Sequence, residues 1–352
     1  MATTIESEPA HAPAGLNGRG ARVTIADIAA ECGVSVATVS KVLNGRRDVA
    51  LTTRERVENS LVSRGYRRRT SGTGEAPPII DIVFDSFDSA WAVEIVRGAI
   101  GAAQYEGLTV ALTSLAEGNE RGVWFDHITA RGTRGIILLL SQLTASQRGE
   151  LRARRLPFVV IDPRGEPGPH VSYVGATNWS GGLAATRHLL DLGHKRIGII
   201  SGPADLLCSR ARHDGYRAAL DTAGIGFDES LVTWGDFLVD GGYARALQLL
   251  SLPAPPTAIF AGSDLQALGV LKAARELELH VPDDLSVVGF DDLPLACWSS
   301  PPLTTVRQPL SDMAAAAVEI VLETDPAGGA DRRVELATDL VVRESTGAPR
   351  DF

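Results

Sequence analysis

The chain is poor in cysteine and methionine, with three Cys and two Met among its 352 residues. Cys32, Cys208 and Cys297 are odd in number, lie far apart and do not stand in a Cys-x-x-Cys spacing. A disulfide scaffold and a structural zinc site both need paired or clustered cysteines, so the sequence argues against either. We therefore expect a reducing compartment, the cytoplasm, and no metal or other cofactor.

Long apolar runs are also absent. The chain has no stretch of eighteen consecutive apolar residues, so no segment is predicted to span a membrane. Residues 1–20 are rich in Ala, Pro and Gly and contain no apolar core of signal-peptide length. They are predicted to form a disordered tail, because they offer nothing that could pack.

The common catalytic signatures are missing as well. No Gly-x-Ser-x-Gly, Gly-x-x-x-x-Gly-Lys-[Ser/Thr], His-Glu-x-x-His or Gly-x-Gly-x-x-Gly motif occurs, and the seven histidines are scattered. His194, in the sequence Leu-Gly-His-Lys-Arg, is predicted to be a turn residue between a helix and a strand rather than a catalytic group. We therefore do not expect an enzyme.

Charge is distributed unevenly. The formal net charge is −9, but between Arg19 and Arg69 there are eleven Arg and Lys residues and only five Asp and Glu residues. A basic amino-terminal region joined to an acidic remainder is typical of a DNA-contacting domain attached to a sensor domain. The alternative is a basic surface that is merely solvated.

Residues 23–44, VTIADIAAECGVSVATVSKVLN, have the pattern of two short helices joined by a tight turn. Thr24 is a candidate cap for a first helix over about residues 25–32, and Gly33 suits a turn that needs positive φ. Ser35 is the candidate cap of a second helix, whose predicted buried stripe is Val39, Val42 and Leu43. This is the arrangement of a helix-turn-helix; a helical hairpin that only packs is the alternative.

These residues resemble the DNA-binding headpiece of the lactose-repressor (LacI/GalR) family of bacterial regulators. The sequence TTRERV (52–57), followed by Arg64, Gly65 and Tyr66, is similar to the family's third helix and the tyrosine that ends it. Three later motifs match the family's effector domain: LGHKRIG (192–198), VVGFDD (287–292) and PLTTV (302–306). The resemblance spans about residues 22–346, and the motifs together are more specific than any one alone.

The resemblance implies which residues of a headpiece at 21–66 contact DNA. Base edges are expected to meet Val36, Ala37 and Lys41. Groups nearer the phosphates are expected to be Thr24, Ser35, Thr38, Ser40, Asn44 and Arg54. Because Val36 and Ala37 offer only apolar contact, Lys41 is expected to provide most of the hydrogen-bonded readout. Many relatives have arginine there, and lysine lacks arginine's bidentate fork toward guanine.

Residues 67–78, RRRTSGTGEAPP, depart from the family pattern. Relatives usually continue with an Ala-rich hinge helix that inserts a leucine into the minor groove, but Gly and Pro disfavour a helix here and no leucine is present. We expect a basic Gly/Pro linker in which Arg67, Arg68 and Arg69 contact DNA electrostatically in a narrow minor groove. A flexible linker that touches DNA only transiently is the alternative.

From residue 79 onward, apolar strands alternate with amphipathic helices. In the first series, strands are predicted at 79–84, 108–113, 135–140 and 157–162, where the series ends. Its helices are predicted at 91–106, with Val93, Val96 and Ile100 on one face, and at 121–131. A second series has strands at 196–201, 231–233, 258–261 and 285–289, and helices at 178–192, 208–223, 241–250, 264–276 and 313–323. Repeated βα units predict parallel sheets covered by helices on both faces.

The predicted fold class is therefore α/β: an all-α helix-turn-helix headpiece followed by an α/β body. The resemblance implies that this body is a two-subdomain, periplasmic-binding-protein-like (type I) effector domain with parallel Rossmann-like sheets, over residues 79–347. The N-subdomain is expected at about 79–175 plus 306–328, and the C-subdomain at 176–305 plus 329–347. The exchange of segments near residues 173–175 and 305–308 is likewise implied by the family.

Polar residues follow several predicted strands, where α/β sheets bind ligands. They include Asp85, Asp162, Ser263, Asp264 and Asp291. The resemblance places effector contacts on Asp162, Arg212, Phe237, Ser263 and Asp291, with Trp91 facing the cleft. Carboxylates, a guanidinium and aromatic faces suit a polyhydroxylated ring.

Some of these assignments have plainer alternatives. Asp264 could simply cap the helix that follows it, and Asp291 could be a turn residue. Arg212 is expected on the face of its helix opposite Ala211 and Leu220. Most relatives have asparagine where Ser263 stands, so its contact is expected to be weaker or differently aimed.

The sequence thus predicts a DNA-binding regulator of transcription, a repressor, that acts as a homodimer on a pseudo-palindromic operator. Its partners would be double-stranded operator DNA, a second copy and a small sugar in the cleft: a pentose, hexose or disaccharide, with xylose or xylobiose as the specific expectation. No membrane partner is expected. The alternatives are a sugar-binding protein that feeds a transporter and a sugar-processing enzyme.

Overall fold

The computed structural model describes residues 25–43, 50–63, 77–84, 89–115, 123–324 and 331–350. The chain divides into two compact units, residues 1–75 and residues 76–352. None of the helices in these ranges combines the length and apolar character needed to cross a membrane.

The first unit contains three helices, α1 (Ile25–Glu31), α2 (Val36–Leu43) and α3 (Leu51–Ser63). Gly33 has a φ of +60° in the turn between α1 and α2, and the Thr38 N–H donates to the Ser35 hydroxyl at 3.1 Å, which caps α2. The small core consists of Ile28, Ala29, Cys32, Val39, Val42 and Val57. The predicted pair of helices with its glycine turn and serine cap is confirmed, although the first helix ends one residue earlier than expected.

The second unit is built on two six-stranded sheets, which with their helices form a first and a second subdomain. The first sheet has the order β11-β5-β4-β3-β1-β2, with neighbours parallel. Its strands are β1 (Ile79–Phe84), β2 (Thr109–Ser114), β3 (Thr133–Leu139), β4 (Phe158–Ile161), β5 (Ser172–Ala176) and β11 (Arg333–Leu336). The second sheet has the order β12-β10-β9-β8-β6-β7, with β12 antiparallel to β10 and the other pairs parallel. Its strands are β6 (Ile197–Ser201), β7 (Val232–Trp234), β8 (Ala258–Ala261), β9 (Ser286–Asp291), β10 (Thr304–Arg307) and β12 (Asp339–Val341).

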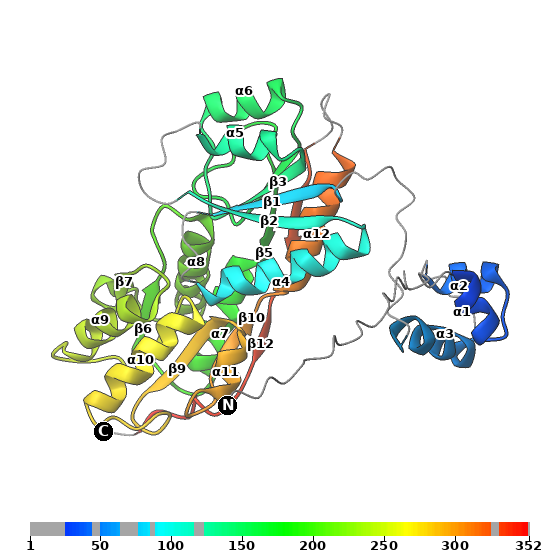
Figure 1. The fold of residues 1–352 in the computed structure, drawn as a ribbon. Helices are drawn as coiled ribbons and strands as arrows, with labels where there is room; N and C mark the ends of the chain where they lie inside the picture. The colour runs from blue at the N-terminus through cyan, green and yellow to red at the C-terminus, as the bar shows by residue number, and fades with distance from the viewer. Residues whose placement is uncertain are drawn as a thin grey trace, which may run out of the picture. The chain divides into compact units, whose positions relative to one another are not determined.

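Helices cover both faces of the first sheet, because successive strand residues point to opposite faces. Ile80 and Ile82 of β1 pack with α4 (Ala90–Tyr105) and α12 (Leu310–Glu323), whereas Val83 packs with α5 (Val123–Ala130) and α6 (Ala145–Ala153). Figure 1 shows α4 and α12 beside one another along the sheet and α5 with α6 on the other side. The alternating α/β plan is therefore confirmed.

The second sheet is covered in the same way. Its helices are α7 (Asn178–Asp191), α8 (Leu207–Thr222), α9 (Val239–Leu250), α10 (Asp264–Glu276) and the short α11 (Pro294–Trp298). Ile259 packs in the cluster formed with α9 and α10, and Phe260 in the cluster formed with α7 and α8. Gly181 at the start of α7 lets that helix approach the sheet, since an added Cβ would lie 2.8 Å from the Phe290 ring.

The chain passes between the subdomains at three described points: from β5 to α7, from β10 to α12 and from β11 to β12 (Figure 1). Thr177 and Thr338 lie on two of these crossings, and the Thr338 N–H donates to the Thr177 hydroxyl at 3.0 Å. Gln308 lies on the third. The crossings at 177 and 308 fall next to the exchange points that the family resemblance implied.

The buried face of α4 differs from the prediction. Val93 and Ile100 are 38% and 39% exposed, whereas Val96 is buried as expected. The buried stripe consists of Trp91, Ala92, Ile95, Val96, Ala99 and Ala103. Because α4 is apolar almost all round, periodicity alone does not select a stripe. The contact with α12 selects it: an added Cβ on Gly98 would lie 2.8 Å from the Ser311 Cα.

The first sheet also extends beyond its predicted strands. The series was expected to end at residue 162, but β5 and β11 continue it. The segment 329–347 was assigned to the C-subdomain, whereas its strand Arg333–Leu336 pairs with β5 in the first sheet. The sheet to which such short strands near the end of the chain belong depends on pairing partners that are distant in sequence. The local residue pattern does not reveal those partners. Helix α6 was not predicted either.

Candidate functional site

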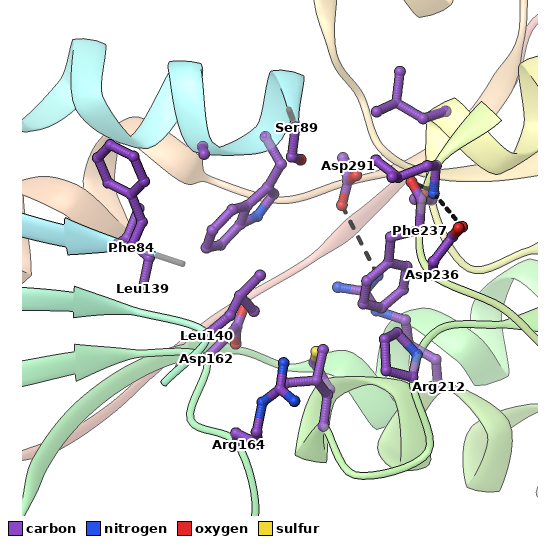
Figure 2. Close-up of a pocket in the computed structure, with 18 residues that line it drawn as sticks. Phe84, Ser89, Leu139, Leu140, Asp162, Arg164, Arg212, Asp236, Phe237 and Asp291 are labelled. Atoms are coloured by element: carbon purple, nitrogen blue, oxygen red, sulfur yellow. Dashed lines mark hydrogen bonds and ion pairs between the residues drawn. The ribbon is translucent and has the colours of Figure 1, made fainter. Parts of the chain in front are cut away.

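A cavity of about 220 Å³ lies between the two subdomains, where strands of both sheets end. The first subdomain contributes Trp91 at the start of α4 and Asp162 directly after β4. The second contributes Arg212, Phe237 and Asp291 on the opposite side, together with Ser263. Figure 2 shows Asp162 across the cavity from Phe237 and Asp291.

Six of the seven predicted effector residues therefore meet around one cavity. They are Trp91, Asp162, Arg212, Phe237, Ser263 and Asp291. The seventh, Asp85, lies outside the described residues. The cavity lining also includes Leu140, Arg164, Leu206, Cys208 and Asp236, which the sequence interpretation missed. Most of these lie close after the end of a strand, so the rule that found Asp162 could have found them.

Arg212 is the central cation of the site and is only 3% exposed. Its Nε donates to Asn178 Oδ1 at 2.8 Å, and its Nη1 donates to the Gly262 carbonyl at 2.5 Å. The guanidinium lies 3.7 Å from the centroid of the Phe290 ring, which fixes its plane. These contacts hold the guanidinium beside the cavity without using all its donors.

The face assigned to Arg212 was wrong. Arg212 was expected opposite Leu220 on its helix, but both residues are buried. Residues eight apart on an α-helix are separated by about 80° around the axis, so they lie toward the same side. The conclusion that Arg212 points to the ligand region does not depend on that argument.

Two buried carboxylates accompany Arg212. Asp291 Oδ1 lies 3.9 Å from Arg212 Nη1 and accepts a hydrogen bond from Gln308 Nε2 at 2.6 Å. Burial raises the pKa of Asp291 to about 7, against the opposing effects of Arg212 and Gln308. Burial likewise raises the pKa of Asp162 to about 6. The site thus holds carboxylates in an apolar surrounding, where hydroxyl donors from a ligand would bind strongly.

The backbone of the cavity wall is strained. Four residues other than glycine that line it have positive φ: Leu140 (47°), Asp162 (48°), Phe237 (67°) and Asp291 (118°). Such conformations cost side-chain-bearing residues about 1–3 kcal/mol and persist where the surrounding structure imposes them, often at ligand sites. Here they turn side chains at strand ends toward the cavity.

Ser263 and Asp264 have roles that differ from those expected. Ser263, not Asp264, caps α10, because its hydroxyl accepts from the Gln266 N–H at 3.1 Å while donating to the Phe237 carbonyl at 2.9 Å. Asp264 is fully buried and accepts from the Leu293 N–H at 2.7 Å and the Thr305 hydroxyl at 2.5 Å. Asp264 therefore fixes the segment after β9, and Ser263 is a cap that also lines the cavity.

The pKa of Asp291 leads to a prediction for stability. In the unfolded chain this carboxyl has its ordinary pKa of 3.8, whereas in the folded protein it retains its proton up to a pKa of about 7. The folded state therefore binds more protons between these values, and stability falls as the pH rises through this range. The groups that face Asp291 are Arg212, Asp162, Gln308 and Asp264.

We expect the wild-type protein to lose about 2–4 kcal/mol of stability relative to Asp291→Asn between pH 4.5 and pH 7.5, and no more above that. Urea unfolding of both proteins across this pH range measures the difference. Parallel stability curves would show that Asp291 is ionised throughout. His188 and His194 titrate in both proteins, so their effects cancel in the comparison.

The described residues contain no cluster of His, Cys, Asp and Glu that could hold a metal ion. Burial raises the pKa of the Cys208 thiol, which lines the cavity, to about 12. His194 follows α7 as predicted and is buried; it bonds Thr257 Oγ1 at 2.9 Å and Ser286 Oγ at 3.0 Å, which indicates a structural role.

The first unit places part of the predicted DNA-contact set along α2 and at the residue that caps it. Ser35, Val36 and Lys41 are exposed, with Val36 44% exposed, and Thr38 is half-buried. Arg54 lies half-buried on α3. Ala37 and Ser40 lie on α2, but their side chains are not among those described. Thr24, Asn44, Arg67, Arg68 and Arg69 lie outside the described residues.

Comparisons with known proteins agree with this organisation. Residues 24–68 match the family of bacterial regulatory proteins, lacI family, and residues 186–346 match the periplasmic binding protein-like domain. The chain is 35% identical over 333 residues to the HTH-type transcriptional repressor CytR of Escherichia coli (strain K12), which covers 92% of this chain and 96% of CytR.

Two solved structures are similar over nearly the whole chain. The transcriptional regulator CelR in complex with cellobiose has a TM-score of 0.70 and 33% identity, covering 92% of this chain and 100% of that one. The lac repressor dimer bound to operator and the anti-inducer ONPF has a TM-score of 0.67 and 26% identity, covering 93% and 100%. The predicted helix-turn-helix and periplasmic-binding-protein-like architecture is confirmed. With the helix-turn-helix unit and the cleft between two α/β subdomains, this similarity establishes that the chain belongs to the LacI family of bacterial regulatory proteins, which are DNA-binding regulators of transcription.

Proposed function

We propose that this protein is a transcriptional repressor that binds operator DNA through α2 and is controlled by a small sugar bound between its two subdomains. The observation that carries the proposal is the position of Arg212, buried between Asp162 and Asp291 at the wall of a cavity that both subdomains line. The helix-turn-helix unit supplies the DNA contact. Operator DNA in bacteria is cytoplasmic, so the proposal also requires a cytoplasmic protein.

A sugar suits the chemistry of the cavity. Its hydroxyl groups can each donate to a carboxylate of Asp162 or Asp291 and accept from the Arg212 guanidinium. Its C–H faces can pack on the rings of Trp91 and Phe237, which come from opposite subdomains. The solved relatives CelR with cellobiose and a LacI family regulator with bound ribose support a sugar as the ligand class.

A ligand in this position would control the relation between the subdomains. Because Trp91 and Asp162 lie on one subdomain and Arg212 and Asp291 on the other, a bound sugar favours the arrangement in which both sets contact it. The change in operator affinity cannot exceed the difference in sugar affinity between the two arrangements. We propose that the linker at 67–78 transmits this change to the DNA-binding units.

The experiment that tests the function is selection of DNA by the purified full-length protein. Genomic fragments retained by the protein are sequenced, and candidate sugars are then added to the complex. We expect the retained fragments to share a pseudo-palindromic sequence. At least one sugar should change the fraction of that sequence to which the protein is bound. Retention without a shared sequence would contradict specific operator binding, and turnover of a sugar would favour an enzyme.

The proposal includes a homodimer, because one helix-turn-helix contacts too few bases for specific binding. An apolar surface suitable for a second copy lies on α4 and on β2, the edge strand of the first sheet: Val93, Ile100 and Leu112 are 38%, 39% and 46% exposed. Exposed apolar side chains gathered on neighbouring elements are typical of interfaces. The solved lac repressor relative is itself a dimer on its operator.

A charge placed in this surface should separate the protomers. We expect Ile100→Glu to be monomeric at micromolar concentration and to bind operator about 100-fold more weakly, since the two half-sites are then no longer engaged together. Sedimentation and operator titration measure both effects. Val342→Glu is the matched control, since Val342 is a 58% exposed aliphatic residue beyond β12. A dimeric Ile100→Glu protein would place the interface elsewhere.

A further inference from the structure

Four residues form a strap that joins the two subdomains beside the cavity. Arg164 and Gly165 follow β4 of the first subdomain, and Asp205 and Leu206 follow β6 of the second. Arg164 Nη1 lies 2.8 Å from Asp205 Oδ2, and the Gly165 N–H donates to the Asp205 carbonyl at 2.9 Å. Arg164 and Leu206 form an isolated antiparallel β-bridge. The strap thus combines an ion pair with backbone contacts.

The strap is also a wall of the cavity. Arg164 and Leu206 both line the cavity, so residues that join the subdomains also bound the cavity on one side. Figure 2 labels Arg164 among the lining residues. The cavity volume of about 220 Å³ is below the ~300 Å³ at which pockets for drug-sized ligands begin. A ligand held while the strap is closed must therefore be compact.

We propose that the strap is a size gate of the sugar site, and that Arg164 and Asp205 are specificity-determining residues that favour a single sugar ring over a disaccharide. The inference rests on the proposed function and narrows its ligand class. A single ring can contact both subdomains while the strap remains closed. A second ring would extend past Arg164 and Leu206 and require the strap to open.

The strap is weak enough to act as a gate. The Arg164 and Asp205 side chains are 41% and 55% exposed, and an ion pair so exposed shifts an equilibrium by about five-fold or less. The backbone contacts remain when either side chain is shortened. Removal of the ion pair should therefore change ligand preference measurably without unfolding the protein.

The test compares sugars of one and two rings by calorimetry on the full-length protein. The probes are D-xylose, D-ribose and D-glucose on one side, and xylobiose and cellobiose on the other. For the wild type, we expect the best monosaccharide to bind about 10-fold or more tightly than the best disaccharide. In Asp205→Ala, whose side chain does not line the cavity, and in Arg164→Ala, this ratio should fall about three- to five-fold.

The double variant should lower the ratio no further than either single change, because each already removes the ion pair. Glu323→Ala is the matched control: it removes an ion pair with Arg332 of similar exposure, 40% and 61%, that lies within the first subdomain. Its ratio should equal that of the wild type. If a disaccharide binds best to the wild type, or if neither strap variant changes the ratio, the gate is refuted while the repressor function stands. If no sugar binds or affects operator occupancy, the proposed function fails and the gate with it.

Discussion

Arg212→Lys is expected to bind operator DNA normally and to lose its response to sugar. Lysine keeps the positive charge that Asp291 and Asp162 need, so the fold should be retained. Its ammonium cannot reproduce the two contacts of the guanidinium, to Asn178 Oδ1 at 2.8 Å and to the Gly262 carbonyl at 2.5 Å, while also reaching a ligand. Loss of one or two charge-assisted hydrogen bonds predicts sugar binding about 100-fold weaker.

The choice of lysine rather than alanine follows from burial. Arg212→Ala would leave Asp291 without its nearest cation, which raises the pKa of this carboxyl above about 7, and would leave Asn178 Oδ1 and the Gly262 carbonyl without their buried donor, so the variant is expected to be less stable. A loss of sugar binding in that variant could then reflect unfolding. Arg212→Lys therefore tests sugar recognition without the loss of protein stability expected for Arg212→Ala.

Titration of the effective sugar, with thermal unfolding beside it, measures the outcome for Arg212→Lys. Arg210→Lys is the matched control, because Arg210 lies on the same helix, two residues earlier, and is exposed. Its sugar affinity should be that of the wild type. An unchanged sugar affinity in Arg212→Lys would remove Arg212 from the binding site, whatever the effect on DNA.

The candidate site was largely predictable because strand ends are visible in the sequence. Asp162 and Asp291 come at the ends of apolar runs, and in a parallel sheet such positions meet at one edge. Arg212 and Phe237 came from the family resemblance, since nothing in the local pattern marks a residue in the middle of a helix or a loop as facing a cavity. The positive φ of Phe237, 67°, has no signature in its residue type.

Elements that a local residue pattern marks could be predicted from the sequence. Elements whose position depends on pairing between distant strands could not. The boundaries of β1 and α10 were predicted correctly from the apolar run of the strand and the helical pattern after it, although the residue that caps α10 is Ser263 and not Asp264. The strand Arg333–Leu336 alternates exposed and half-buried residues and gave no apolar run. Its place beside β5 depends on pairing with a strand about 160 residues earlier in the chain.

The strap and the carboxylates suggest how a ligand signal is shared. Asp291 accepts from Gln308, which lies on a crossing between the subdomains, so this carboxylate of the cavity wall is directly bonded to that crossing. On the other side of the cavity, Arg164 is held to Asp205 of the opposite subdomain. A sugar that contacts both walls would therefore stabilise one relative position of the subdomains at two separate points.

Lys41→Ala is expected to weaken binding to the operator about 10- to 100-fold per half-site and to leave binding to random DNA nearly unchanged. Lys41 is exposed on α2, and the loss of one good base interaction costs about 1–3 kcal/mol. The slope of affinity against salt should change by about one unit or less per half-site, because one positive charge is removed from each protomer. Operator and random duplexes titrated over a range of salt concentrations give both quantities.

The contrasting variant is the triple alanine substitution of Arg67, Arg68 and Arg69. If these arginines bind phosphates, affinity should fall for every DNA sequence, and the salt slope should decrease by nearly three units per protomer, about 0.9 for each phosphate that is no longer neutralised. Equal losses of affinity on operator and random DNA in Lys41→Ala would contradict base readout by Lys41. An unchanged salt slope in the triple variant would leave the linker without a role in DNA binding, and the headpiece would then have to supply the whole electrostatic attraction from α1, α2 and α3.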